Sequence, residues 1–131
     1  MAHRDEFDIS DDYMTDVAIA ESLSRTWAAF FHAHGRLTEV QRRSMPTILD
    51  GNDVLVTSPT ASGKTEAACA PLVERMLRTG REWTVLYISP TRALVNDLFR
   101  RLCGPVESLG LAIRRRTGDS RARSRRSPAS S

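Results

Sequence analysis

The residues best suited to chemistry lie in one short stretch, positions 58–65, which reads Ser-Pro-Thr-Ala-Ser-Gly-Lys-Thr. Small residues let a backbone approach a ligand closely, and glycine adopts conformations that other residues disfavour. Loop N–H groups, a helix N-terminus and one ammonium together form a cradle for phosphate groups. The stretch therefore predicts a phosphate-binding loop. The alternative is a Gly-Lys-Thr turn that only caps a helix.

Lys64 is the only lysine among the 19 basic residues of the chain; the others are arginine. An ammonium is a compact point charge on a flexible stem, whereas a guanidinium is broad and planar. A phosphate cradle gives this one position a chemical reason to hold lysine. The hydroxyl of the next residue, Thr65, is placed to bind Mg²⁺.

The composition is that of an ordinary globular chain. Its 131 residues are 40% hydrophobic and 27% charged, which excludes a collagen-like chain, a disulfide scaffold and a wholly disordered protein. Apolar runs are too short to span a bilayer, so we expect no membrane contact. No apolar signal segment follows the polar start, and we expect a cytoplasmic location. The two cysteines and three histidines lack metal-ligand spacing.

Charge is distributed unevenly along the chain. Residues 1–31 hold seven acids and two arginines, whereas residues 111–131 hold seven arginines and one aspartate. A basic end favours contact with a polyanion such as nucleic acid. The alternative is a solvated tail without a partner.

The elements around the loop follow from hydrophobic spacing and from turn residues. We expect an amphipathic helix from Asp16 to about Phe31, stopped by Gly35. A capping box, in which Gln41 is the third helical position, opens the next helix at Thr38. Further helices are predicted over 64–78 and 92–103, and short strands over 54–56, 83–88 and 111–113. Pro46 and the pair Gly104-Pro105 should interrupt or end their helices.

Strands that alternate with helices predict an α/β fold with a parallel sheet, preceded by N-terminal helices. The loops over 58–63, 89–91 and 117–119 then lie at the carboxyl edge of the sheet, where such folds bind ligands. We divide the chain into an acidic, disordered head (1–15), a domain that contains the phosphate-binding loop (16–119) and a disordered Arg/Ser-rich tail (120–131).

The segment from Pro59 to Ala67 resembles the phosphate-binding loop of DEAD/DEAH-type superfamily 2 helicases, and Glu66-Ala67-Ala68 resembles the Lhr-like branch. This resemblance implies a partial RecA-like P-loop NTPase domain that uses ATP and Mg²⁺. The strict loop pattern has glycine where Ser58 stands. Ala61 replaces the family's usual glycine, which matters if the loop needs a positive φ there. The residues implied to bind the cofactor are Thr60, Ala61, Ser62, Gly63, Lys64 and Thr65.

Three further segments match the family in the same order. Residues 37–53 resemble its Q motif, which implies that Gln41 reads adenine; the alternative is that Gln41 only completes the capping box. Residues 89–98 resemble motif Ia, and Thr117-Gly118-Asp119 a segment of Lhr-like enzymes. They imply nucleic-acid contacts, with a helix cap and an ordinary turn as the alternatives. The nucleic-acid-binding residues are then Pro90, Thr91, Arg92, Thr117 and Gly118.

Hydrolysis of ATP needs an acidic pair after an apolar strand, and no Asp-Glu pair follows Lys64 in this sequence. We therefore expect the N-terminal part of a first motor domain, truncated before its Asp-Glu motif, that binds ATP and nucleic acid without unwinding. A non-enzymatic module that binds nucleic acid through its basic tail is the rival hypothesis. Another nucleotide-binding protein, such as a small kinase, leaves motif Ia unexplained.

Overall fold

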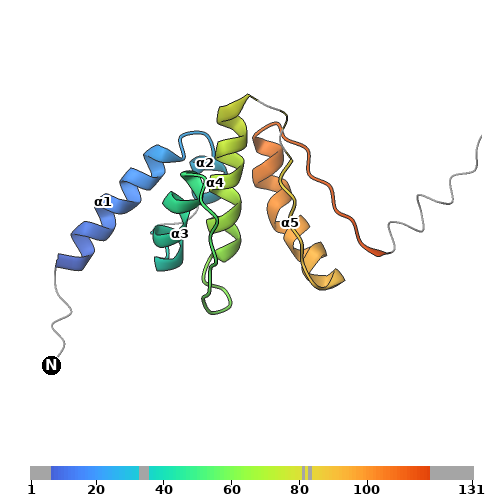
Figure 1. Cartoon of the computed structure of the whole chain (residues 1–131), viewed down its shortest axis with the longest axis horizontal. Helices are drawn as coiled ribbons and strands as arrows, with labels where there is room; N and C mark the ends of the chain where they lie inside the picture. Colours follow the sequence, from blue (N-terminus) through green and yellow to red (C-terminus); the bar gives the residue numbers. More distant parts are fainter. Residues whose placement is uncertain (1–6, 33–35, 81, 83, 119–131) are drawn as a thin grey trace, which may run out of the picture. The chain divides into compact units, whose positions relative to one another are not determined.

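The computed structural model describes residues 7–32, 36–80, 82 and 84–118 of the chain. By their contacts the residues form two compact units, Met1–Val85 and Leu86–Ser131. Within the described residues, the first unit contains four helices and the second contains one (Figure 1). Their bounds are α1 Phe7–Ser22, α2 Trp27–Phe31, α3 Glu39–Leu49, α4 Lys64–Thr79 and α5 Arg92–Ser108.

Helix α4 provides the core of the first unit. Helices α2 and α3 pack against α4, and α1 packs against α3. Phe31 and Leu23 are among the largest fully buried side chains, and the rings of Phe31 and Trp27 lie 4.9 Å apart between centroids. Apolar burial of this kind is the main favourable term in helix packing. The other buried apolar side chains of this unit are Ile19, Phe30, Leu37, Met45, Ile48, Ala67, Cys69, Ala70 and Val73.

The helix expected over residues 16–31 differs in two ways. It begins at Phe7, so that residues 7–15, expected to be disordered, are helical; residues 1–6 and the predicted stop at Gly35 lie outside the described residues. It is also divided into α1 and α2 by a turn over 23–26. The carboxylate of Glu74 accepts hydrogen bonds from the backbone N–H of Arg25 at this turn, at 3.2 and 3.3 Å. A carboxylate from α4 therefore provides an acceptor for a backbone N–H at the break between the two helices.

An ion pair joins α1 to α3. The Arg42 Nε lies 2.6 Å from Asp16 Oδ1, and both side chains are largely buried, at 15% and 13% exposed. Arg42 Nη2 and the backbone N–H of Leu37 donate to the second oxygen, each at 3.2 Å. A carboxylate held by several donors in a fixed geometry is a specific link between elements rather than a loose surface pair.

Helix α3 opens with the predicted capping box. The Thr38 hydroxyl accepts from the N–H of Gln41, and the Gln41 side chain accepts from the N–H of Thr38. The predicted interruption at Pro46 is wrong, because α3 continues through it to Leu49. Proline removes one hydrogen bond here, and burial of Met45 and Ile48 on either side of it opposes that loss.

Helix α4 ends as predicted. Gly80 follows its last residue with φ 60°, the left-handed cap typical of glycine. Helix α5 is longer than predicted, because it passes through Gly104-Pro105 and ends at Ser108. In its unit the side chain of Leu102 is buried. Pro105 removes one helical hydrogen bond, and burial of Leu102 one turn before it opposes that loss.

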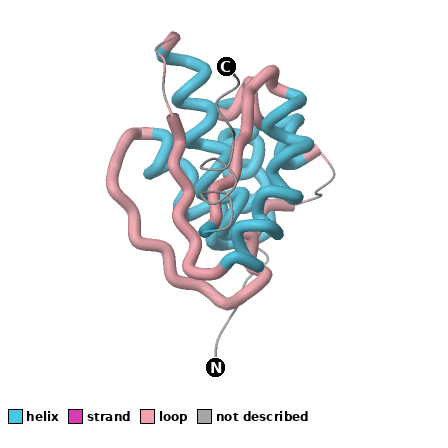
Figure 2. The backbone as a smooth tube through the Cα atoms, turned by 90° about the vertical axis from the view of Figure 1, so that its right-hand side faces the viewer, coloured by secondary structure: helices cyan, strands magenta, loops and turns pink. Residues whose placement is uncertain are grey.

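The three predicted strands are not formed in the described part of the chain. Residues 54–58, 84–89 and 111–117 are loops in which no residue pairs in a β-ladder (Figure 2); Trp83 lies outside the described residues. A helix satisfies its backbone groups within one segment, whereas a strand needs a neighbouring strand. The described residues therefore form helices of the expected α/β fold but not its sheet.

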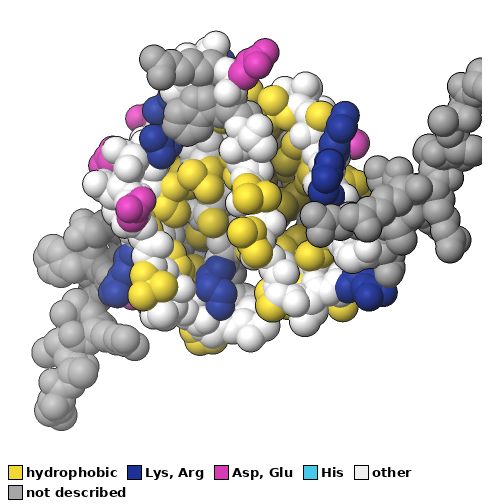
Figure 3. All heavy atoms as spheres, turned by 45° about the vertical axis from the view of Figure 1, so that its right-hand side comes forward, with side chains coloured by type: hydrophobic (Ala, Val, Ile, Leu, Met, Phe, Trp, Pro, Cys, Tyr) yellow, Lys and Arg dark blue, Asp and Glu magenta, His cyan; other side chains and the backbone are white. Residues whose placement is uncertain are grey.

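The apolar side chains of these segments reach the surface. Leu55 is 91% exposed, Leu86 80% and Ile88 81%, and hydrophobic side chains lie among the surface atoms in Figure 3. In a sheet of this class both faces are covered by helices. These side chains are exposed because the segments that carry them are not paired in a sheet.

Among the residues that the structure describes, no helix has both the length and the apolar character that crossing a membrane requires.

Candidate phosphate-binding site

The loop over 58–63 joins an extended segment to the first turn of α4. Gly63 is the N-cap residue of α4 with φ 84°, and Ala61 has φ 60°. Ala61 is the single non-glycine residue with positive φ in the described part of the chain. Two left-handed residues within three positions turn the loop over the end of the helix. The sequence analysis noted that alanine at position 61 matters if the loop needs a positive φ there. The structure shows a positive φ at Ala61.

The ammonium of Lys64 folds back onto the loop. Its Nζ donates to the carbonyl oxygens of Ser58 at 2.5 Å and of Pro59 at 3.2 Å. The hydroxyls of Ser58 and Ser62 lie 2.6 Å apart and share a hydrogen bond. The lysine therefore reaches from the first residue of α4 back to the first two residues of the loop. The positive charge thus lies against carbonyl groups of the loop that leads into α4, and the N-terminus of a helix favours anions.

Glycine at position 63 leaves α4 without a capping side chain. The carbonyl of Gly63 accepts the N–H of Ala67 at 3.0 Å, which is the first hydrogen bond of the helix. N–H groups in a first helical turn have no partner within their own helix. The sequence-predicted residues Thr60, Ala61, Ser62, Gly63, Lys64 and Thr65 are thus brought together at a helix end suited to phosphate.

Gln41 is brought to the same place from α3. It is 4% exposed; its Oε1 accepts from the N–H of Thr38 at 2.9 Å, and its Nε2 donates to the carbonyl of Gly63 at 3.2 Å. The capping-box role is therefore confirmed. The adenine role stays a prediction, because each end of an amide keeps capacity for a second hydrogen bond.

A hollow of about 500 Å³ adjoins the loop. Its size falls within the range of small-molecule sites. The side chains of Glu39 and Arg43, two of its lining residues, form an exposed ion pair with 2.6 Å between Oε1 and Nη2. The lining comes from the start of α3, the extended segment and the loop: Thr38, Glu39, Val40, Arg43, Ser44, Val54, Leu55, Val56, Thr57, Ser58, Pro59 and Ser62.

The residues predicted to contact nucleic acid belong to the second unit. Pro90, Thr91 and Arg92 are exposed at the start of α5, and the Thr91 hydroxyl caps this helix by accepting the N–H of Leu94 at 3.2 Å. Thr117 is half-buried and Gly118 is exposed; Asp119 lies outside the described residues. The expected meeting of three loops at one sheet edge depends on a sheet that is not formed in the described residues.

Sequence reasoning missed two clusters. Arg115 lies over the ring of Phe99 at 4.9 Å and donates to Asn96 Oδ1 at 2.9 Å, and no spacing rule links these positions. Glu74 is fully buried on α4. A signal for Glu74 existed, because it follows Ala70 by one helical turn on the apolar face of the helix.

The match to a family model extends from Thr38 across the loop and into the second unit. The model is described as DEAD/DEAH box helicase, and it matches residues 38–129. This chain belongs to the DEAD/DEAH box helicase family. Membership implies a RecA-like α/β fold.

The curated relatives of this chain include RNA helicases and Lhr-Core helicases. An ATP-dependent rRNA helicase, RRP3 of Encephalitozoon cuniculi, is 40% identical over 83 residues, which are 63% of this chain and 20% of the relative. A DEAD-box ATP-dependent RNA helicase, CshC of Bacillus cereus, is 44% identical over 62 residues, 47% of this chain and 16% of the relative. The ATP-dependent helicase Lhr-Core protein 2 of Thermococcus barophilus is 38% identical over 104 residues, 72% of this chain and 12% of the relative.

The chain thus spans a fifth or less of the length of each of these three relatives. The predicted family resemblance is confirmed, and Lhr-Core proteins are among the relatives. No solved structure matches the chain.

Proposed function

We propose that this chain is the ATP-binding and nucleic-acid-contacting part of an ATP-dependent helicase. The observation that carries the proposal is the loop at the start of α4, where the Lys64 ammonium lies over loop carbonyls and Gly63 turns into the helix. This arrangement suits a triphosphate better than a plain helix cap, since a cap needs no lysine. In the longer relatives' architecture the same part would serve to couple ATP hydrolysis to strand movement, in a cytoplasmic enzyme.

Each residue of the loop has a part in the proposed site. Backbone groups from Thr60 to Gly63 would surround the β- and γ-phosphates, and Lys64 would neutralise their charge once it leaves the loop carbonyls. The Thr65 hydroxyl fits Mg²⁺, because this ion prefers oxygen ligands and completes its shell with phosphate oxygens and water. The ion would supply charge neutralisation and orientation of the phosphates. Gln41 would contact the adenine edge with its remaining hydrogen-bonding capacity.

The nucleic-acid contact is proposed for Pro90, Thr91 and Arg92 at the start of α5, and for Thr117 and Gly118. A helix N-terminus and an exposed arginine suit backbone phosphates. The rival candidate is a non-enzymatic module whose arginines at 121–126 bind nucleic acid; these positions lie outside the described residues. The charge of the C-terminal segment favours this rival.

The ATP part is tested by titrating the chain with a fluorescent ATP analogue in the presence of Mg²⁺. We expect Lys64→Ala to weaken binding at least tenfold, about 1.4 kcal/mol. Lys64→Arg should not restore the affinity, because a planar guanidinium does not replace an ammonium inside the loop. Arg100→Ala, on α5, is the control for loss of one positive charge. Equal affinities of the Lys64→Ala variant and the unsubstituted chain contradict the proposal.

The two nucleic-acid readings are separated by salt titration with single-stranded RNA and DNA. Under the motif Ia reading, Arg92→Ala lowers affinity and reduces the salt slope by about one unit. Under the tail reading, Arg92→Ala has no effect, and replacing Arg121, Arg123, Arg125 and Arg126 by serine abolishes binding. The same experiment determines which nucleic acid is preferred.

A further inference from the structure

Arg115 ties the segment that follows α5 back onto that helix. Its guanidinium carbon lies over the ring of Phe99, 4.9 Å from the ring centroid, and its Nη1 donates to Asn96 Oδ1 at 2.9 Å. A planar guanidinium can stack on an aromatic face and donate hydrogen bonds from its edge at the same time. Phe99 and Asn96 are three positions apart on α5 and are therefore neighbours on one helix face. The two contacts together form a tether that holds the segment at one point of the helix.

The residues of the tethered segment alternate between half-buried and exposed. Leu111 and Ile113 are half-buried, whereas Arg114 and Arg116 are exposed. A period of two is typical of an extended backbone, in which successive side chains lie on opposite sides. Arg115 belongs to the side of Leu111 and Ile113 and contacts α5. Arg114 and Arg116 therefore share the opposite, exposed side.

The second unit carries an excess of positive charge. Residues 86–118 contain six arginines but only two acidic residues, Asp97 and Glu107. Arginine suits phosphate well, because its planar fork donates two parallel hydrogen bonds. Positions two apart in an extended segment are separated by about 6.6 Å, so Arg114 and Arg116 can reach successive phosphates of one strand. The charge and the spacing point to a polyanion as the ligand.

We propose that Arg114 and Arg116 bind successive phosphates of a single-stranded nucleic acid and that Arg115 is the positioning residue that holds them in place. The proposal rests on the proposed nucleic-acid function of the second unit. A segment without the tether has to be ordered when the ligand binds, and the tether lowers that entropic cost. Further along the segment, a Cβ atom on Gly118 would meet no described atom within 4 Å, which leaves room for a strand beside the backbone.

The exposed arginines have a second physical explanation. Charged side chains on an unpaired segment oppose its association with other chains, and Leu86 and Ile88 of the same unit are exposed. Repulsion between chains needs charge but no fixed position. The contacts of Arg115 with Phe99 and Asn96 fix the segment, so they favour the phosphate contact.

The phosphate contact is tested by salt titration of the full chain with fluorescently labelled oligo(dT) and oligo(U), followed by anisotropy. We expect the variant with Arg114→Gln and Arg116→Gln to bind about tenfold more weakly. The slope of log affinity against log salt should fall by about 1.4, since each contact with a single strand contributes about 0.7. The matched control, Arg100→Gln with Arg101→Gln, removes two exposed charges from α5 and should leave the slope unchanged. An unchanged slope in the first variant, or increased self-association at unchanged affinity, overturns the proposal.

The tether is tested by Phe99→Leu, which removes the ring without changing the charge. Binding should weaken about threefold and the salt slope should fall, because Arg114 and Arg116 lose their fixed positions. Arg115→Gln should weaken binding to the same extent, and the two substitutions combined should have no larger effect than either alone. If Phe99→Leu loses helicity by circular dichroism, Asn96→Ala, which removes the acceptor of Arg115, takes its place. If only Arg115→Gln lowers affinity and slope, Arg115 contacts phosphate itself and its positioning role is overturned.

The same titrations separate this inference from the proposed function. A chain that binds neither oligonucleotide overturns the proposed nucleic-acid function and this inference together. A chain whose binding is weakened by Arg92→Ala or by loss of the arginines at 121–126, but not by Arg114→Gln with Arg116→Gln, retains the proposed function and overturns this inference alone.

Discussion

Ala61 holds a backbone conformation that costs an L-residue energy. Its φ of 60° lies in the left-handed region, which disfavours a Cβ by roughly 1–2 kcal/mol. The loop keeps this conformation although the residue is not glycine. The neighbouring contacts of Lys64 and Ser62 with Ser58 stabilise the turn that imposes it.

Ala61→Gly should therefore stabilise the chain by about 0.5–1 kcal/mol, since relief of strain exceeds the added freedom of the unfolded chain. Urea denaturation followed by circular dichroism measures this change. Ala68→Gly is the matched control, because the same substitution inside α4 should destabilise by about 1 kcal/mol. A destabilised Ala61→Gly chain would show that the left-handed turn is not strained.

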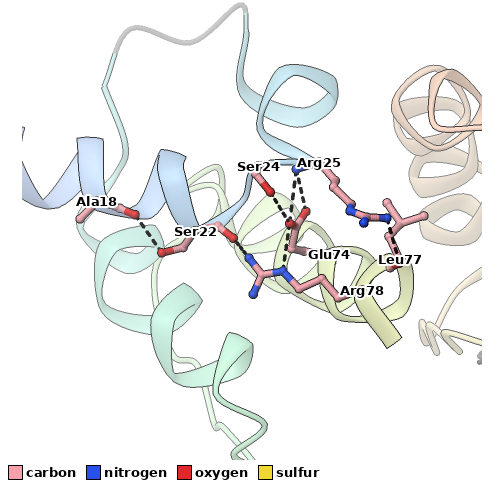
Figure 4. Close-up of polar contacts among 7 residues, drawn as sticks. All are labelled: Ala18, Ser22, Ser24, Arg25, Glu74, Leu77 and Arg78. Atoms are coloured by element: carbon pink, nitrogen blue, oxygen red, sulfur yellow. Dashed lines mark hydrogen bonds and ion pairs between the residues drawn. The ribbon is translucent and has the colours of Figure 1, made fainter. Parts of the chain in front are cut away.

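At the scale of elements, a buried carboxylate fixes the junction of α1 and α2 on α4. Glu74, which is fully buried, accepts from the Ser24 hydroxyl at 3.4 Å, from the Arg25 N–H and from Arg78 Nε at 3.2 Å (Figure 4). Arg78 also donates to the carbonyl of Ser22, and Arg25 Nη1 donates to that of Leu77 at 3.1 Å. The cluster gives polar backbone groups of the turn between α1 and α2 their partners.

Glu74→Ala should destabilise the first unit by about 2 kcal/mol, because the Arg25 N–H and the Arg78 guanidinium lose their acceptor and a cavity opens at a fully buried position. Glu74→Gln, which keeps one acceptor oxygen, should cost less and remain folded where the alanine variant does not. Glu39→Ala is the control: its ion pair with Arg43 is exposed and contributes about 0.5 kcal/mol or less. Chemical denaturation of the three variants measures these differences, and equal costs for Glu74→Ala and Glu39→Ala would refute the structural role of the cluster.

At the scale of the whole molecule, the residues that the structure describes form helices without the sheet that such helices should cover. The described segments that were predicted as strands expose Leu55, Leu86 and Ile88. Exposed apolar segments with unpaired backbone groups favour association with other chains. They also leave little apolar burial to offset the entropy of folding.

We therefore expect a melting temperature below about 60 °C and self-association that increases with concentration. Replacing Leu86 and Ile88 by lysine should reduce self-association in sedimentation velocity at equal protein concentration. Replacing the exposed Arg100 and Arg101 by lysine is the control for substitution at the surface. A cooperative melt well above 60 °C, or a monomer at all concentrations, would contradict this expectation.

The sequence by itself determined what depends on neighbouring residues. The capping box at Thr38, the glycine stop at Gly80 and the order of residues 58–65 are local patterns, and helices satisfy their hydrogen bonds locally. Family membership also follows from such ordered motifs.

Only the tertiary structure decided what depends on distant partners. Pro46 and Gly104-Pro105 remain inside helices, although local rules place breaks there, because packing can outweigh helix propensity. The division between α1 and α2 depends on Glu74, some fifty positions away in the chain. The link from Gln41 to Gly63 likewise joins separate elements. Strand pairing is the extreme case: alternation and β-branched residues predict where a strand forms, but its hydrogen bonds exist only when a partner segment lies beside it.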